Sequence, residues 1–151
     1  MLGFVSGGVI RATMVGILVV IVALFFTHLA VANFLIVIVA LLITAFLFAL
    51  AGLVNGFFAK SFDAISIVPT FVLTPLTYLG GVFYSVDQLP PFFRTLSLFN
   101  PILYIVNLFR YGFLGQSDVA PLTAFLVLLG FSVGFLVLTT WLFARGKGLK
   151  N

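Results

Sequence analysis

The sequence has no cysteine, a single histidine and few charged residues. Without cysteine the chain can form no disulfide bond and offers no thiol chemistry. One histidine alone does not make a zinc site, and we expect His28 to be a polar loop residue. Charged residues make up 7% of the chain, against about 25% in an ordinary soluble domain. With 64% apolar residues and a mean hydropathy of +1.38, the chain requires lipid as its main solvent.

The three acidic residues, Asp63, Asp87 and Asp118, lie at the edges of apolar stretches. Carriers driven by protons or sodium generally need a carboxylate inside the membrane, so this pattern argues against such a carrier. The sequence also lacks a phosphate-binding loop of the GxxxxGKS or GxxxxGKT type. Basic residues are not interleaved with aromatic ones, which argues against a nucleic-acid partner. We therefore expect no enzyme activity, no metal and no cofactor site in this chain.

Long uncharged stretches predict membrane spans. Residues 12–59 carry no charge and are long enough for two spans of about 20 residues each. The polar residues near Asn33 mark the break between them. A third apolar stretch contains Pro69 and Pro75, each of which can kink a helix. We place the four spans at residues 9–27, 33–58, 64–84 and 119–143.

The segment before the last span is interrupted by charges and prolines. Its longest uncharged run is too short to cross the hydrocarbon core at about 1.5 Å per residue. We expect two half-helices, at residues 89–99 and 101–114, in an external segment, 86–118, that re-enters the membrane or lies at its interface. The predicted fold class is an all-α, polytopic transmembrane helix bundle, a single domain over residues 1–151.

Lysine and arginine mark the cytoplasmic side of membrane proteins. In the four-span arrangement, five basic residues fall on one side and Arg94 and Arg110 fall on the other. We therefore expect both termini in the cytoplasm. The five topology determinants are Arg11, Lys60, Arg145, Lys147 and Lys150.

Two Gly-x-x-x-Gly pairs, Gly52/Gly56 and Gly130/Gly134, lie within predicted spans. This spacing lets helix backbones approach closely in lipid. Packing within one bundle and contact with a second subunit both fit the pattern. Asn55, beside Gly56, fits a packing role and a functional role equally well.

The stretch up to Arg110 carries the most specific pattern in the chain. A helix ends in small residues, a Leu-Pro pair follows, then another proline, then an aromatic and a basic residue. The elements, in order, are Leu79, Gly80, Gly81, Leu89, Pro90, Pro101, Tyr104 and Arg110. This order resembles the signature of the ABC-2 type permeases, the membrane subunits of bacterial ABC exporters. It is similar to the branch that exports drugs, lipo-oligosaccharides and polysaccharides.

The resemblance implies a permease subunit of the bacterial inner membrane that forms the translocation path for a substrate. A separate ABC ATPase subunit would bind ATP and magnesium, a second permease subunit would complete a homodimer, and membrane lipids would surround both. The signature residues would form an external gate. Since family members have six spans, the chain would hold spans three to six, as a fragment or a truncated product. The alternative is a truncated membrane scaffold or accessory subunit that transports nothing.

Overall fold

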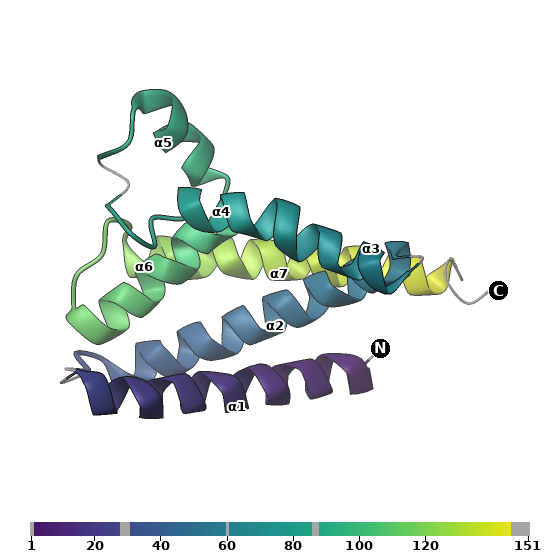
Figure 1. The fold of residues 1–151 in the computed structure, drawn as a ribbon, viewed down its shortest axis with the longest axis horizontal. Helices are drawn as coiled ribbons and strands as arrows, with labels where there is room; N and C mark the ends of the chain where they lie inside the picture. The colour runs from purple at the N-terminus through teal and green to yellow at the C-terminus, as the bar shows by residue number, and fades with distance from the viewer. Residues whose placement is uncertain (1, 28–30, 60, 86–87, 146–151) are drawn as a thin grey trace.

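The computed structural model describes residues 2–27, 31–59, 61–85 and 88–145 (Figure 1). Over these ranges the chain is helical and contains no strand, which confirms the predicted all-α class. The predictions outside the described residues concern His28, Lys60, Asp87, Lys147 and Lys150. The elements, in chain order, are α1 (Leu2–Phe26), α2 (Phe34–Phe58), α3 (Phe62–Ile67), the π-helix η1 (Val68–Leu73), α4 (Thr74–Leu79), α5 (Pro91–Leu98), α6 (Pro101–Leu114) and α7 (Pro121–Ala144).

Three helices, α1, α2 and α7, are each long and apolar enough to cross a membrane. The half-helices α5 and α6 meet at 85° and together would pass the same test as one broken span or re-entrant pair. The polytopic helix bundle is therefore confirmed, with two half-helices before the last long helix.

The long helices define two ends of the bundle. α1 runs antiparallel to α2, and α7 runs parallel to α2 (Figure 1). We call the end at which α2 and α7 begin the Asn33 end, and the end at which they finish the Ala144 end. The N–H groups of Ala32 and Asn33 donate to the carbonyl oxygens of Phe113 and Gly112, at 3.2 and 2.8 Å. These bonds tie the start of α2 to the end of α6, so α6 also finishes at the Asn33 end.

Local sequence signals set the helix boundaries. The Asn33 side chain accepts from the N–H of Ile36 at 3.3 Å and caps α2. A proline lies at the start of α5, α6 and α7, where its missing N–H would have had no partner in any case. Gly115 ends α6 at a φ of 72°, a left-handed conformation that disfavours residues with a Cβ.

α2, α6 and α7 pack against one another and form the core. α6 is therefore a half-helix buried within the bundle, and its placement in or at the surface of the membrane stays a prediction. The core residues are Ala40, Ile43 and Leu47 of α2, Leu103, Tyr104, Ile105 and Leu108 of α6, and Ala124 and Leu128 of α7.

α1 lies at the edge of the bundle and packs on α2. Two glycines allow the close approach: a Cβ at Gly8 would lie 3.0 Å from the Cβ of Ala49, and one at Gly16 would lie 2.6 Å from Leu41 Cδ1. Val5 is the one buried side chain among those described in α1. Most of the other described side chains of α1 that are exposed are apolar, as in a lipid-facing span; Arg11 is an exposed charged one.

The predicted third span, residues 64–84, is a helical segment in three parts, α3, η1 and α4. It ends at Leu79 rather than at Tyr84, because Gly80 closes α4 and Gly81 follows with a φ of 72°. This segment is shorter than the three long helices. It is therefore not among the helices long enough to cross a membrane by themselves, which corrects the predicted third span.

Candidate functional site

Arg110, near the end of α6, joins three segments of the chain. Its Nη1 forms an ion pair with Asp118 Oδ2 at 2.9 Å, and its Nη2 donates to the carbonyl oxygen of Gly81 at 2.8 Å. Asp118 lies in the loop before α7 and Gly81 follows α4. The Arg110 and Asp118 side chains are 23% and 21% exposed, so solvent screens the pair only in part. We call Arg110, Asp118 and Gly81 the Arg110 clamp.

Asn107, one turn before Arg110, fixes the loop that leads into α7. Its side chain is almost fully buried. The Oδ1 atom accepts from the N–H groups of Asp118 and Val119, at 2.7 and 3.1 Å, and the Nδ2 atom donates to the carbonyl oxygen of Leu103 at 2.9 Å. A buried amide with satisfied partners on both sides holds its neighbours in one conformation. Asn107 therefore keeps the Asp118 carboxylate within reach of Arg110.

The corner between α5 and α6 is fastened to α4. Asn100 is buried, its Nδ2 donates to the carbonyl oxygen of Leu76 at 2.6 Å, and its Oδ1 accepts from the N–H of Ile102 at 3.0 Å. Gly80 lies so close to α6 that a Cβ would be 2.6 Å from Ile102 Cγ2. The end of α4 is therefore held at the corner by both a hydrogen bond and tight packing.

The structure brings five of the eight signature residues to this junction of α4, α6 and α7: Gly80, Gly81, Pro101, Tyr104 and Arg110. The Tyr104 hydroxyl donates to the carbonyl oxygen of Leu98 at 2.7 Å, which closes the corner between the half-helices. Of the other three, Leu79 ends α4, Leu89 packs on the core, and Pro90 precedes α5 at an exposed position. The signature thus corresponds to a packed, hydrogen-bonded junction.

Asn100, Asn107 and Asp118 belong to the junction but not to the site predicted from the sequence. Asn100 precedes Pro101 at a helix start, where asparagine is a favoured cap. Asn107 is a polar residue in an apolar helix, which in a membrane indicates a hydrogen-bonding role. Both signals were present in the sequence. The pairing of Asp118 with Arg110 had no such signal, because it depends on how the loop after α6 folds back.

An apolar cavity of about 280 Å³ lies behind the broken third segment. Its wall is built from α2, the η1–α4 segment, the start of α6 and one side chain of α7. Among its lining residues are Leu47 and Ala51 of α2, Val72 of η1, and Phe135 of α7, and Asn55 is the polar side chain there.

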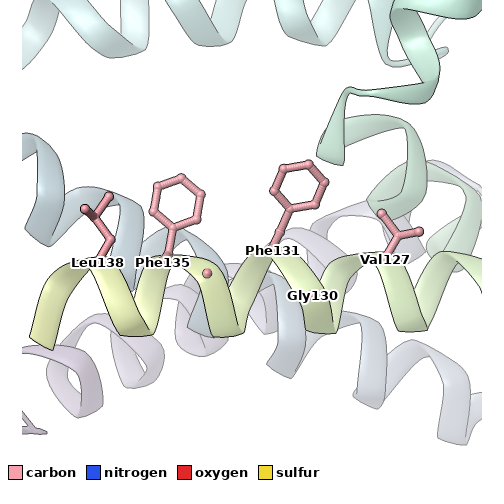
Figure 2. A pocket seen from close by; sticks show the side chains of 6 residues that line it. Val127, Gly130, Phe131, Phe135 and Leu138 are labelled. Carbon is pink, nitrogen blue, oxygen red and sulfur yellow. The ribbon is translucent and has the colours of Figure 1, made fainter. Parts of the chain in front are cut away.

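A second, open groove of about 480 Å³ runs along α7. Figure 2 shows Val127, Phe131, Phe135 and Leu138 projecting from one side of this helix, with Gly130 beside them. Phe135 also reaches the cavity behind η1, so the groove and the cavity adjoin there.

In the described part of the chain, no other helix lies against the glycine pairs that were predicted to pack helices. A Cβ at Gly52, Gly56, Gly130 or Gly134 would meet no atom within 4 Å. The glycines at close helix contacts are others, such as Gly112, where a Cβ would lie 2.7 Å from Val37 Cγ2. Packing within one bundle therefore does not use the two predicted pairs, and contact with a second subunit stays a prediction.

The two described topology determinants lie on different helices. Arg11 is exposed on α1, and Arg145 follows α7 with its guanidinium carbon 3.9 Å from the centre of the Trp141 ring. Such a cation–π contact fits a residue anchored where the membrane meets water. Among the described residues, no group of three or more His, Asp or Glu side chains is placed to hold a metal ion.

Comparison with known proteins places this sequence in a family. Residues 1–114 match the model of the ABC-2 type transporter family. The chain is 56% identical over 149 residues to the inner membrane transport permease YadH of Escherichia coli strain K12. The match covers 99% of this chain and 58% of that permease.

More distant relatives match about half of the chain. Nodulation protein J of Rhizobium leguminosarum biovar viciae is 38% identical over 74 residues, which is 49% of this chain and 29% of that protein. Nodulation protein J of Sinorhizobium fredii is 31% identical over 74 residues, which is 49% of this chain and 28% of that protein. No solved structure matches.

Proposed function

The chain belongs to the ABC-2 type transporter family, and we propose that it forms the translocation path of an ABC exporter in the bacterial inner membrane. A separate ABC ATPase subunit would bind ATP and magnesium, since the sequence carries no phosphate-binding loop of its own. The transport permease name of the Escherichia coli relative supports this function. The chain would contribute helices that move, rather than side chains that react.

The observation that carries the proposal is the Arg110 clamp. It joins the turn after α4, the half-helix α6 and the loop before α7 at the Asn33 end of the bundle. α7 runs from this junction to the Ala144 end (Figure 1). Rigid helices carry coupling between distant sites, so a push by the ATPase at the Ala144 end would reach the junction through α7. The signature residues would then act as an external gate that moves as one unit.

We place the Ala144 end in the cytoplasm. Arg145 lies at that end. The arrangement predicted from the sequence puts five basic residues on the side of Arg145 and two, Arg94 and Arg110, on the other, and basic residues favour the cytoplasmic side. α1 begins and α7 finishes at the same end (Figure 1), so both termini would share that side. A cysteine at Gln116 would then react with a membrane-impermeant thiol reagent in intact cells, and one at Ser61 would react only after permeabilisation. Labelling of both positions in intact cells would contradict this orientation.

A second copy of the permease would complete the path. The open Gly130/Gly134 pair supports this proposal, because it leaves the backbone of α7 accessible along an apolar groove. Small residues at this spacing let another helix approach closely in lipid. Membrane lipid would cover the groove in a single copy.

The partnership is tested by co-expressing the chain with its cognate ATP-binding subunit and purifying the complex in lipid nanodiscs. We expect the two to co-purify, and the ATP hydrolysis rate of the ATP-binding subunit to change when the chain is bound. A chain that assembles in the membrane but never associates with the ATP-binding subunit would contradict the proposal and favour the non-transporting scaffold.

A further inference from the structure

The third helical segment contains a proline whose missing donor is replaced from another helix. In a regular α-helix the carbonyl oxygen of Ile65 would accept from the N–H of residue 69, but Pro69 has no N–H. The Asn55 Nδ2 on α2 donates to the Ile65 carbonyl oxygen instead, at 2.9 Å. The side chain of Asn55 thus completes the backbone bonding of α3 at the break. In lipid, an unpaired carbonyl at this position would be costly.

Beyond the break the backbone changes register. Residues 68–73 form a π-helix, η1, before the α-helical register returns in α4. Threonine hydroxyls supply further bonds at the change: Thr77 Oγ1 donates to the carbonyl oxygen of Leu73 at 2.7 Å, and Thr74 Oγ1 contacts the carbonyl oxygen of Pro69 at 3.5 Å. π-helical turns inside α-helices are rare and are frequently found at functional positions.

The two ends of this segment are held, and its middle is not packed into the core. The α3 end is tied to α2 by Asn55, and the α4 end is tied to the α5–α6 corner by the bond from Asn100 to Leu76. No residue of η1 or of α4 is buried, so the ends differ from the middle by these hydrogen bonds and not by burial. Val72 of η1 faces the 280 Å³ apolar cavity, whose far wall includes Ala51 of α2. The space beside η1 is thus not filled by packed side chains of this chain.

We propose that η1 is a hinge that bends into this cavity between two fixed points, and that Asn55 is the pivot at its α3 end. A change between π and α register alters the path of residues 68–73 while the Asn55 and Asn100 bonds keep α3 and α4 in place. The hinge would thereby change the volume of the cavity behind it. This inference concerns the motion of the chain itself and does not depend on transport.

Distances between pairs of spin labels test the hinge, and the absence of native cysteine makes the labelling specific. The test pair is Phe71→Cys with Val137→Cys, and the control pair is Tyr78→Cys with Val137→Cys. All three positions are exposed, and Tyr78 lies on the fastened α4. In nanodiscs we expect a distance distribution about two-fold broader for the test pair than for the control pair, or two populations. Equal, narrow distributions for both pairs would overturn the hinge.

Two variants test whether Pro69 and Asn55 are responsible for the motion of η1. Pro69→Ala restores the N–H at position 69, so the test-pair distribution should narrow to the width of the control pair. If Pro69→Ala does not fold, the comparison of the two pairs in the unaltered background still decides. For a third pair, Ile67→Cys with Val137→Cys, we expect a narrow distribution in the unaltered background and a broader one in Asn55→Leu. An unchanged third pair in Asn55→Leu would overturn the role of Asn55 as pivot.

Discussion

Arg110 and Asp118 form an ion pair of 2.9 Å across the loop that joins α6 to α7, and the same guanidinium holds the carbonyl oxygen of Gly81. Three segments thus meet at one side chain. The planar guanidinium suits this arrangement, because its N–H groups point in fixed and different directions. A lysine at the same position would have one nitrogen with which to reach both partners.

A double-mutant cycle measures the coupling energy between Arg110 and Asp118. Because both side chains are mostly but not fully buried, we expect a coupling energy of about 1 kcal/mol between Arg110→Ala and Asp118→Ala. Arg110→Lys should recover only part of the loss, since it keeps the charge without the second bond. Unfolding in lipid bicelles at two salt concentrations gives the free energies. Additive effects of the two single variants would show that the pair contributes nothing.

Asn107 should matter more to stability than the exposed helix cap at Asn33. Asn107→Ala leaves the partly buried N–H groups of Asp118 and Val119 without their side-chain acceptor, which we expect to cost about 1–3 kcal/mol of unfolding free energy. Asn33→Ala removes one exposed bond of 3.3 Å and should cost about 0.5–1 kcal/mol. The comparison uses the same unfolding assay for both variants. A larger effect at Asn33 than at Asn107 would contradict the account of the junction.

The bond from Asn55 to Ile65 should depend on Pro69. In the unaltered background Asn55→Leu removes the donor that replaces the missing N–H of Pro69, at an expected cost of about 1–3 kcal/mol. In a Pro69→Ala background the backbone supplies its own donor, so the same substitution should cost less. Unfolding free energies of the four proteins form the cycle. An identical cost of Asn55→Leu in both backgrounds would rule out this exchange of donors.

Two glycines with opposite surroundings provide a matched pair for helix packing. Gly112→Ala places a Cβ 2.7 Å from Val37 Cγ2 and 3.2 Å from its backbone nitrogen, so it should destabilise the fold by about 1–3 kcal/mol. Gly134→Ala meets no atom within 4 Å in the single chain, so it should leave the fold intact and weaken self-association. Unfolding and cross-linking yield in the membrane separate the two effects. Destabilisation of the single chain by Gly134→Ala would contradict this assignment.

Composition and charge spacing were sufficient to predict the helical class, but the start of the first long helix was predicted too late, since α1 begins at Leu2 and not at residue 9. In lipid, the backbone N–H and C=O groups of a long uncharged apolar stretch find their partners when the stretch forms a helix. α2 begins one residue after the predicted boundary, with Asn33 as its cap. The division of the segment before α7 at Pro101 was predictable for a similar reason, because proline can begin a helix but not continue one.

Contacts that depend on tertiary packing were not predictable in this way. The choice between Gly112 and Gly134 as the close helix contact depends on which helix faces which, and a Gly-x-x-x-Gly spacing does not encode that. The approach of Gly80 to Ile102 likewise depends on how α4 and α6 face each other. To predict the role of Asn55 one would have to know how α2 and α3 are aligned across the turn that separates them.

Transport by inside-out membrane vesicles, made with and without the cognate ATP-binding subunit, tests most directly whether the chain forms the translocation path of an ATP-driven exporter. The vesicles are supplied with ATP and a panel of fluorescent amphiphiles, and uptake is followed in the presence and absence of vanadate. We expect vanadate-sensitive uptake of at least one compound only when both subunits are present, and loss of this uptake in a variant of the ATP-binding subunit that cannot hydrolyse ATP. Uptake that persists without the ATP-binding subunit would contradict this expectation.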